Sequence, residues 1–411
     1  MKFLCLGLAL LFLSDAQAQS APAQFSGHLR GQWDGVLANQ AGPMAAANML
    51  QPGLLAAPVN TSKLETELRA SGHGISAVLT LQQQDPSASA QNAQAWVNEL
   101  VASHDGGAWQ FSAGKKIVAW DVGYGFRPND MVQQEERRTL GNSTPQGRPM
   151  LLAEHFDADT AWSWVWVNPS ASVQALGAQE PALAARVYQR QGAADWYGFA
   201  RMGARTGVST GVALAWVASD ALELHSSVKY SNRLDAQFMS PNSNGLVASN
   251  PWQQGSLTAV TQWLVGGTWT SQNQLSLLAE AWWDGSAPTD DQWSAWSLRN
   301  QQLDTLATLG APTAAVAGNL AWQAQGLTGG QNLRRRNVFV RLSWENGVWK
   351  PAFDILYTPA DQGRAVTASL TWQGDRVQVQ TGLRAYGAAA NAVFAMLPTR
   401  RMGFVALTMA F

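Results

Sequence analysis

The sequence predicts an all-β protein, a transmembrane antiparallel β-barrel of about 18 strands. The first observation is alternation, because segments of about ten residues place apolar side chains on one face and polar side chains on the other. The second is composition: the chain has 20 tryptophans, but charged residues make up only 13%, against about 25% in soluble proteins. The third is the pair of chain ends, an apolar leader and a terminal aromatic, Phe411.

The leader has the composition of a secretory signal peptide. A lysine precedes an apolar run over residues 3–13, and a small-x-small cleavage site ends at Ala18. The run is too short to span a bilayer. Cys5 is the only cysteine, so the processed chain would form no disulfide and no thiolate metal site. We expect removal of residues 1–18 and a single barrel domain over 19–411, with no plug domain before the first strand.

Segments that alternate strongly enough are predicted as strands. In the first half of the chain they cover residues 24–36, 62–70, 75–82, 95–102, 109–114, 149–157, 160–167 and 184–191. In the second half they cover residues 195–206, 207–218, 221–232, 257–270, 273–283, 334–344, 348–357, 365–372, 376–386 and 400–411. Alternation over 184–191 is weak, so a barrel of about 16 strands is the alternative, and both numbers are even, as this class requires.

Short and long connections alternate along the second half. Short turns are predicted at 271–272, 345–347 and 374–375, and long loops at 233–256 and 284–333. This pattern is typical of barrels with short periplasmic turns and long extracellular loops. A helix at 290–309, within its long loop, is an alternative interpretation of that stretch.

A soluble β-sandwich would also alternate, so the strand ends and polar faces decide between the two folds. Strands end at Trp283, Trp344, Tyr357 and Trp372, and we expect these aromatics at a common level, in a girdle at the membrane interface. The polar faces carry charges of both signs, which need the water that a barrel lumen supplies. The expected lumen-facing residues are Lys63, Glu65, Arg69, Glu223, Lys229, Glu280, Arg341, Lys350, Asp354 and Arg384.

The stretch from Trp109 to Leu140 has a composition of its own. It opens as a strand and continues with Gly123, Gly125, Pro128 and a cluster of charges. Because glycine permits sharp bends, we expect the chain near 118–148 to fold into the lumen and narrow it. The alternative is a solvated external loop, the usual position of a charge run. The expected constriction residues are Asp121, Arg127, Asp130, Glu135, Glu136, Arg137 and Arg138.

The same stretch carries a motif. It contains Gly114, Lys115, Lys116, Trp120, Gly123, Pro128, Asn129 and Asp130. This resembles G-[KR]-x-x-x-x-W-G followed by N-P-x-D in bacterial outer-membrane porin-like barrels, among them alginate-export-type families. Trp-Gly stands here as Trp120-Asp121 and Asn-Pro as Pro128-Asn129. The resemblance covers about thirty residues; it implies an outer-membrane barrel and identifies no solute.

No residue pattern indicates catalysis, a metal or a cofactor. The five histidines form no HExxH and no paired metal spacing. Ser163 near His155 is no recognisable nucleophile–base motif. Gly123 and Gly125 precede no helix with a Lys-Ser/Thr signature, so they form no phosphate loop. We therefore expect a protein that is not an enzyme.

Two functional hypotheses follow. The first is a channel in the bacterial outer membrane for a small hydrophilic solute. The second is a surface receptor, adhesin or assembly partner that acts through long Trp-bearing loops, with Trp293 and Trp296. Expected partners are outer-membrane lipid, lipopolysaccharide and the barrel-assembly machinery, for which Phe411 would be the assembly signal. A formal net charge of −1 argues against nucleic acid, and the oligomeric state is left open.

Overall fold

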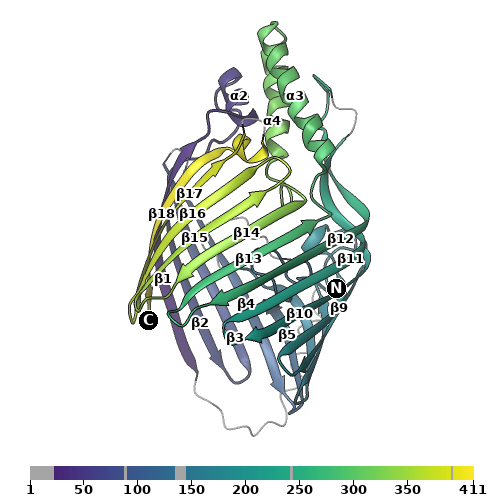
Figure 1. Cartoon of the computed structure of the whole chain (residues 1–411), viewed down its shortest axis with the longest axis vertical. Coiled ribbons are helices and arrows are strands. Elements are labelled where there is room, and N and C mark those ends of the chain that lie inside the picture. Colours follow the sequence, from purple (N-terminus) through teal and green to yellow (C-terminus); the bar gives the residue numbers. More distant parts are fainter. Residues whose placement is uncertain (1–22, 88–89, 135–144, 241–243, 390–391) are drawn as a thin grey trace.

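The chain forms a closed β-barrel of 18 antiparallel strands, shown in Figure 1. Each strand pairs with its neighbours in sequence. The ring closes where β1 (Gln24–Ala38) pairs with both β2 (Thr61–Gly72) and β18 (Thr399–Ala410). Closure leaves no sheet edge with unpaired backbone groups. The computed structural model describes residues 23–87, 90–134, 145–240, 244–389 and 392–411, so the predicted signal peptide lies outside the described residues.

The predicted number of 18 strands is confirmed, and the weakly patterned segment at 184–191 forms a strand, β8. The strands of the first half are β3 (Ile75–Pro86), β4 (Asn92–Asp105), β5 (Trp109–Lys116), β6 (Arg148–Phe156), β7 (Thr160–Val167), β8 (Ala182–Gln191) and β9 (Ala194–Gly203). Those of the second half are β10 (Gly207–Ser219), β11 (Leu222–Met239), β12 (Trp252–Thr270), β13 (Leu275–Asp284), β14 (Arg336–Trp344), β15 (Trp349–Thr358), β16 (Gly363–Gln373) and β17 (Val377–Gly387).

Side chains alternate between an apolar outer face and an inner face. In β18, the outward residues Val405, Leu407 and Met409 are 48%, 52% and 46% exposed, while the inward residues Phe404 and Ala406 are buried. In β7 the exposed outward residues are tryptophans. An exposed apolar belt on a closed barrel is the surface that lipid covers. The outward tryptophans of β7 are Trp162, Trp164 and Trp166.

The two ends of the barrel differ. Most short hairpins, such as 73–74 and 220–221, lie at one end, which we call the turn end, together with the start of β1 and the last residue of β18 (Figure 1). The long connections lie at the opposite end, which we call the loop end. This is the predicted arrangement of short turns and long loops.

Helices occur in the connections at the loop end. They are α2 (Pro43–Leu50), α3 (Asp290–Thr308), α4 (Thr313–Gln325) and the short 3₁₀ turns η1 (Gly177–Gln179) and η2 (Val393–Met396). The helical interpretation of 290–309 is confirmed as α3, which a capping box of Thr289 and Gln292 starts. Helices α2 and α4 were not predicted. Within the described residues, no helix combines the length and apolarity needed to cross a bilayer.

The prediction of one aromatic girdle at a common level is wrong. Successive antiparallel strands end at opposite ends of the barrel, so Trp283 and Tyr357 lie toward the loop end, whereas Trp344 and Trp372 lie toward the turn end. Trp372 pairs directly with Trp349, the first residue of β15. The aromatics therefore mark two levels, as the two interfaces of a bilayer require.

Candidate functional site

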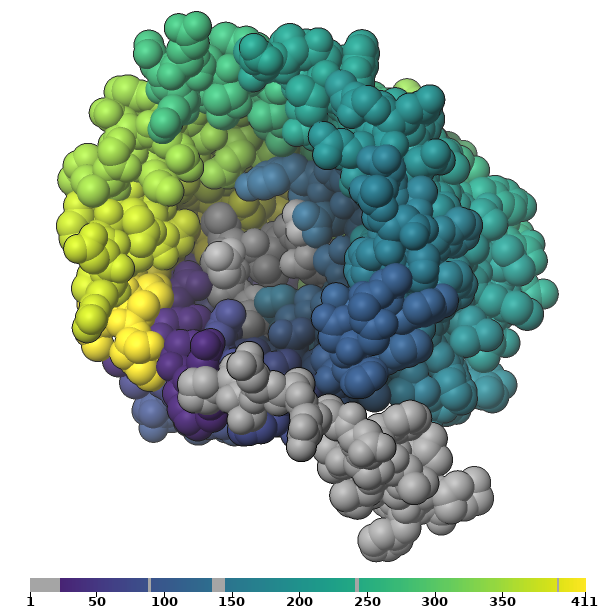
Figure 2. Space-filling model, turned by 90° about the horizontal axis from the view of Figure 1, so that it is seen from below, coloured from purple at the N-terminus to yellow at the C-terminus, as the bar shows by residue number. Residues whose placement is uncertain are grey.

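The part of the connection between β5 and β6 that the structure describes before residue 135 lies inside the barrel. We call its residues 117–134 the inner segment. They contact inward-facing side chains of strands from β6 to β14 rather than extending from the loop end. Figure 2 views the molecule from below, and the wall of strands encloses a hollow. The inner segment therefore occupies space that would otherwise belong to the lumen.

Asp121 joins the inner segment to strand β11. Its Oδ2 accepts hydrogen bonds from the Asn129 backbone N–H at 2.6 Å and from the Ser227 hydroxyl at 2.8 Å. The Asn129 amide donates to Ser227 Oγ and to the carbonyl oxygens of Val212 and Val228. Burial raises the pKa of Asp121, and the hydrogen bonds from Asn129, Ser227 and Val122 together with the charge of Arg127 oppose that rise. The carboxyl group thus fixes both ends of the turn 121–129.

The sharp bend is at Asp121, not at the glycines that the sequence suggested. Asp121 has a φ of 94°, in the region that usually favours glycine, whereas Gly123 and Gly125 have no positive φ. A Cβ at Gly123 would lie 2.0 Å from the Phe126 carbonyl oxygen. The glycine there permits close backbone approach, so its predicted role as the bend is wrong.

Glu280 on β13 holds the tip of the inner segment. Its two carboxylate oxygens accept the backbone N–H groups of Tyr124 and Gly125, each at 2.6 Å. His225 on β11 lies 3.0 Å from Glu280 Oε1 through Nε2, and both side chains are buried. Hydrogen bonds to a carboxylate are stronger than those between neutral groups. Glu280 is therefore the strongest single anchor of the tip.

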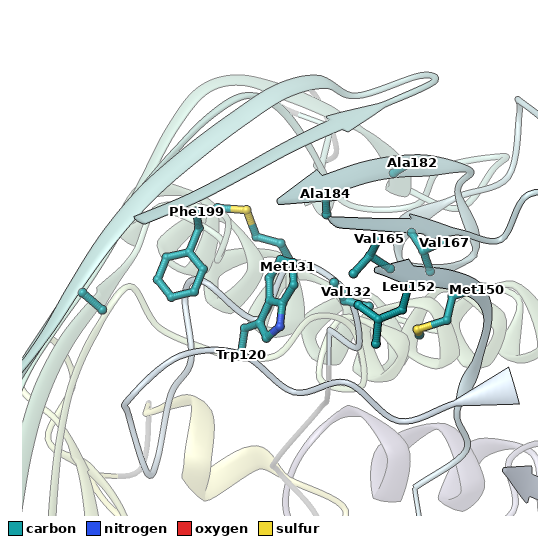
Figure 3. Packing of buried hydrophobic residues seen from close by; sticks show 11 residues of the cluster. Trp120, Met131, Val132, Met150, Leu152, Val165, Val167, Ala182, Ala184 and Phe199 are labelled. Atoms are coloured by element: carbon teal, nitrogen blue, oxygen red, sulfur yellow. The ribbon is translucent and has the colours of Figure 1, made fainter. Parts of the chain in front are cut away.

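An apolar patch on the inner wall is covered by the inner segment. Trp120, Met131 and Val132 pack against inward side chains of β6 to β10, as Figure 3 shows. The Trp120 ring lies 6.1 Å from that of Phe199. Without the segment these wall residues would face lumen water, so burial of the patch stabilises the docked state. The wall residues of the patch are Met150, Leu152, Val165, Val167, Ala182, Ala184, Phe199 and Ala213.

Beside the tip, the wall is polar. Tyr124 is 43% exposed, and its ring lies 5.7 Å from that of Phe339 with the Arg341 guanidinium 5.6 Å from its centroid. Arg341 donates to both oxygens of Asp354, at 3.0 and 3.1 Å. Arg384 donates to the Thr367 hydroxyl at 2.8 Å. Tyr124 thus stands next to a row of hydrogen-bonding groups that runs from β14 to β17.

The structure brings part of the predicted set together. Asp121, Arg127 and Asp130 lie in the inner segment, and Arg127 donates to the Gly123 carbonyl oxygen at 2.8 Å. Glu135, Glu136, Arg137 and Arg138 lie outside the described residues. The ten predicted lumen charges share the inward register of their strands, among them Glu65 and Lys229, which are buried. Phe411 continues the outward face and exchanges two 3.0 Å backbone hydrogen bonds with Gly27.

Several residues that fix the segment were not predicted. Asn129 was noted only as part of the motif, and Ser227 and His225 are single polar residues with no motif around them. Only the inward register of β11, readable from its alternation, places Ser227 and His225 in the lumen. Gly211 was not predicted either. A Cβ there would lie 1.8 Å from Asn129 Oδ1, so the glycine leaves room for the Asn129 side chain.

The tryptophans proposed for surface recognition are not at the surface. Trp293 and Trp296 on α3 are 3% and 1% exposed. They pack with Trp252 and donate hydrogen bonds to the carbonyl oxygens of Leu333 and Gln323. The expectation that these residues form a receptor surface is wrong. Among the described residues, no group of three or more metal-ligand side chains comes together.

Comparisons with known proteins bear on the fold. No protein-family model and no curated protein matches the chain. It is similar to the solved structure of OccAB1 from Acinetobacter baumannii, with 10% identity, 97% of this chain and 98% of that chain covered, and a TM-score of 0.57. OccK8 (OprE) from Pseudomonas aeruginosa has 10% identity, covers 95% of this chain and 98% of its own, and has a TM-score of 0.54. These likenesses show the fold, the closed 18-strand antiparallel barrel of outer-membrane porin structures.

Proposed function

We propose that the protein is an outer-membrane channel for a small hydrophilic solute, with the inner segment as its constriction. The apolar outer belt between two aromatic levels supports a position in a bilayer. The polar inner wall supports passage of water-soluble molecules. The resemblance to alginate-export-type barrels stays a prediction, and it leaves the solute open.

The observation that carries this proposal is the anchoring of the inner segment by Glu280 and Asp121. A loop that only happened to enter the lumen would not have a buried carboxylate on two consecutive backbone N–H groups, each at 2.6 Å. Wall charges of both signs lie beside the tip, with Arg341 paired to Asp354. We therefore expect weak bulk ion selectivity and selection mainly by size and hydrogen bonding.

The test uses single cysteines as targets for a bulky thiol reagent, because Cys5 in the predicted signal is the only native cysteine. Tyr124→Cys places a thiol at the 43% exposed tip position. Leu309→Cys, at a 77% exposed position after α3, is the matched control. In planar bilayers the reagent should lower the conductance of Tyr124→Cys and leave that of Leu309→Cys unchanged. Equal currents before and after modification of Tyr124→Cys would remove the constriction from the proposal.

The predicted charges at Arg137 and Arg138 allow a second measurement. If they face the lumen, a positive charge there attracts anions and repels cations. Replacing both by serine should raise cation preference while the barrel still assembles. An unchanged reversal potential in a salt gradient would instead support the external position for these residues.

A further inference from the structure

The outer surface near the loop end carries arginines in the last positions before the apolar belt begins. Arg336, Arg364 and Arg401 are exposed, and each stands in outward register on its strand, β14, β16 and β18. Outward apolar residues follow within a few positions, Val338 on β14 and Val366 on β16. The guanidinium groups are thus placed at the border between the lipid-covered surface and water.

These arginines lack acidic partners. In the part of the chain that the structure describes, no carboxylate oxygen lies within 4.0 Å of Arg336, Arg364 or Arg401. At this rim, Asp290 and Asp361 are both paired with the buried Arg334, at 3.3 and 3.6 Å. A positive charge therefore remains uncompensated at this border, in a chain whose formal net charge is −1.

Aromatic side chains hold part of this group in place. The guanidinium carbons of Arg335 and Arg336 each lie 5.7 Å from the centroid of the Trp283 ring. Arg364 pairs across the strands with Tyr357, and its Nε lies 3.6 Å from the position that a Cβ of Gly387 would take. A guanidinium stacked on an aromatic ring loses less freedom when its N–H groups bind an oxyanion.

We propose that Arg336, Arg364 and Arg401, with Arg335 on Trp283, bind the phosphate groups of the lipopolysaccharide headgroup. Guanidinium donors match phosphate oxygens in bidentate geometry. The adjoining apolar belt would at the same time contact the acyl chains of the same molecule, which a free phosphate does not offer. This inference rests on the proposed position in the outer membrane, with the loop end on the lipopolysaccharide side.

The test measures lipid binding by the purified full chain in detergent, using native mass spectrometry with lipid A. The variant is Arg336→Gln/Arg364→Gln. The matched control is Arg190→Gln/Arg376→Gln, which removes two exposed arginines at the turn end. The first variant should bind bis-phosphorylated lipid A about tenfold more weakly, and the control should bind it like the wild type. Adding Arg401→Gln should weaken binding further.

Two additional ligands separate the sources of phosphate. Dephosphorylated lipid A should bind wild type and variants equally weakly. Inorganic phosphate should displace the lipid only at concentrations far above that of the lipid. Equal affinity of the wild type for the two lipid A forms, or wild-type affinity in Arg336→Gln/Arg364→Gln, would overturn the site. Displacement at matching phosphate concentrations would overturn the assignment to a lipid.

Channel recordings in a bilayer of neutral lipid keep this inference separate from the proposed function. The variant Arg336→Gln/Arg364→Gln should conduct like the wild type, because both side chains face away from the lumen. A lost lipid preference with normal conductance supports the site as proposed. A protein that binds lipid A through these arginines but conducts no ions would refute the channel and leave the lipid site standing.

Discussion

Two long connections at the same end of the barrel satisfy their backbone groups and bury their apolar side chains in different ways. Residues 117–147 join β5 to β6, and residues 285–335 join β13 to β14. The first has no helix among its described residues, and it buries Trp120 and Met131 against the inner wall. The second folds into α3 and α4, whose apolar residues pack on each other, on α2 and on the rim.

The difference lies in what satisfies the backbone. Helices α3 and α4 satisfy their own N–H and C=O groups, so that connection can stand at the rim (Figure 1). The inner segment has no regular structure, and its N–H groups depend on wall side chains such as Glu280. A connection whose backbone N–H groups donate to side chains of the lumen wall is held in the lumen. Four predictions test this contrast, from the largest expected effect to the smallest.

The largest effect should follow from removing the inner segment. Replacing residues 121–133 with a short Gly/Ser linker removes the turn held by Asp121, the tip held by Glu280, and Met131 and Val132 from the cover of the apolar patch. The barrel strands remain, so heat-modifiable, membrane-inserted protein should still form. We expect single-channel conductance to rise about twofold or more, because the lumen cross-section widens. Unchanged conductance in an assembled barrel would show that the segment does not limit the flow of ions.

Removing only the anchor of the tip should have a smaller effect. Glu280→Ala leaves the N–H groups of Tyr124 and Gly125 without their acceptor, at a cost of about 1–3 kcal/mol for each unsatisfied group. We expect noisier current and cleavage after Phe126 by chymotrypsin, because Phe126 is buried in the docked state. Glu223→Ala, an exposed inward residue on β11, is the control. If both variants record the same quiet current as the wild type, Glu280 is no anchor.

Weakening the helical connection, residues 285–335, should change local stability without changing conductance. Arg299 on α3 is fully buried and donates to the Gln323 and Asn319 side chains and the Gly245 carbonyl oxygen. Arg299→Ala should leave these acceptors unsatisfied and weaken the packing of α3 on α4 by about 2–5 kcal/mol. Hydrogen exchange in α3 and α4 should accelerate, while conductance should stay within the scatter of the wild type. An increase in current noise as large as that expected for Glu280→Ala would contradict the contrast between the two connections.

The fold was predictable in detail because each strand carries its own signal. Alternation over 400–411 puts Leu407 and Thr408 on opposite faces of the strand, and in β18 Leu407 is exposed on the outer face. The prediction of one girdle is wrong because β13 and β14 run in opposite directions, so Trp283 and Trp344 lie at opposite ends of the barrel. Helix α4 was missed because its Ala-rich sequence has no charged face to contrast with its buried one.

The candidate site was only partly predictable. Glu280 was expected in the lumen because it alternates with Ala279 and Ala281, but its partners lie about 155 residues away in sequence. No periodicity relates such distant residues. Asp121 was identified for its charge, although its role comes from hydrogen bonds to Asn129 and Ser227. Alternation along a strand predicts the face on which a residue lies. Which residues meet in the lumen depends on how the closed barrel brings distant strands together.

The smallest effect concerns pH and the inner segment. Burial raises the pKa of Asp121 above its usual value of 3.8 when the segment is docked. A carboxyl group with a raised pKa binds its proton more tightly in the docked state, so its contribution is fully present below pH 3.8 and is lost as the pH rises through the docked pKa. Lowering the pH from 7 toward 4 should therefore reduce segment noise in the current. Asp121→Asn, which cannot ionise, should flatten this dependence, while Asp304→Asn on α3 should retain it. A wild-type noise level that rises on acidification would reverse the sign and assign the pH response to another group.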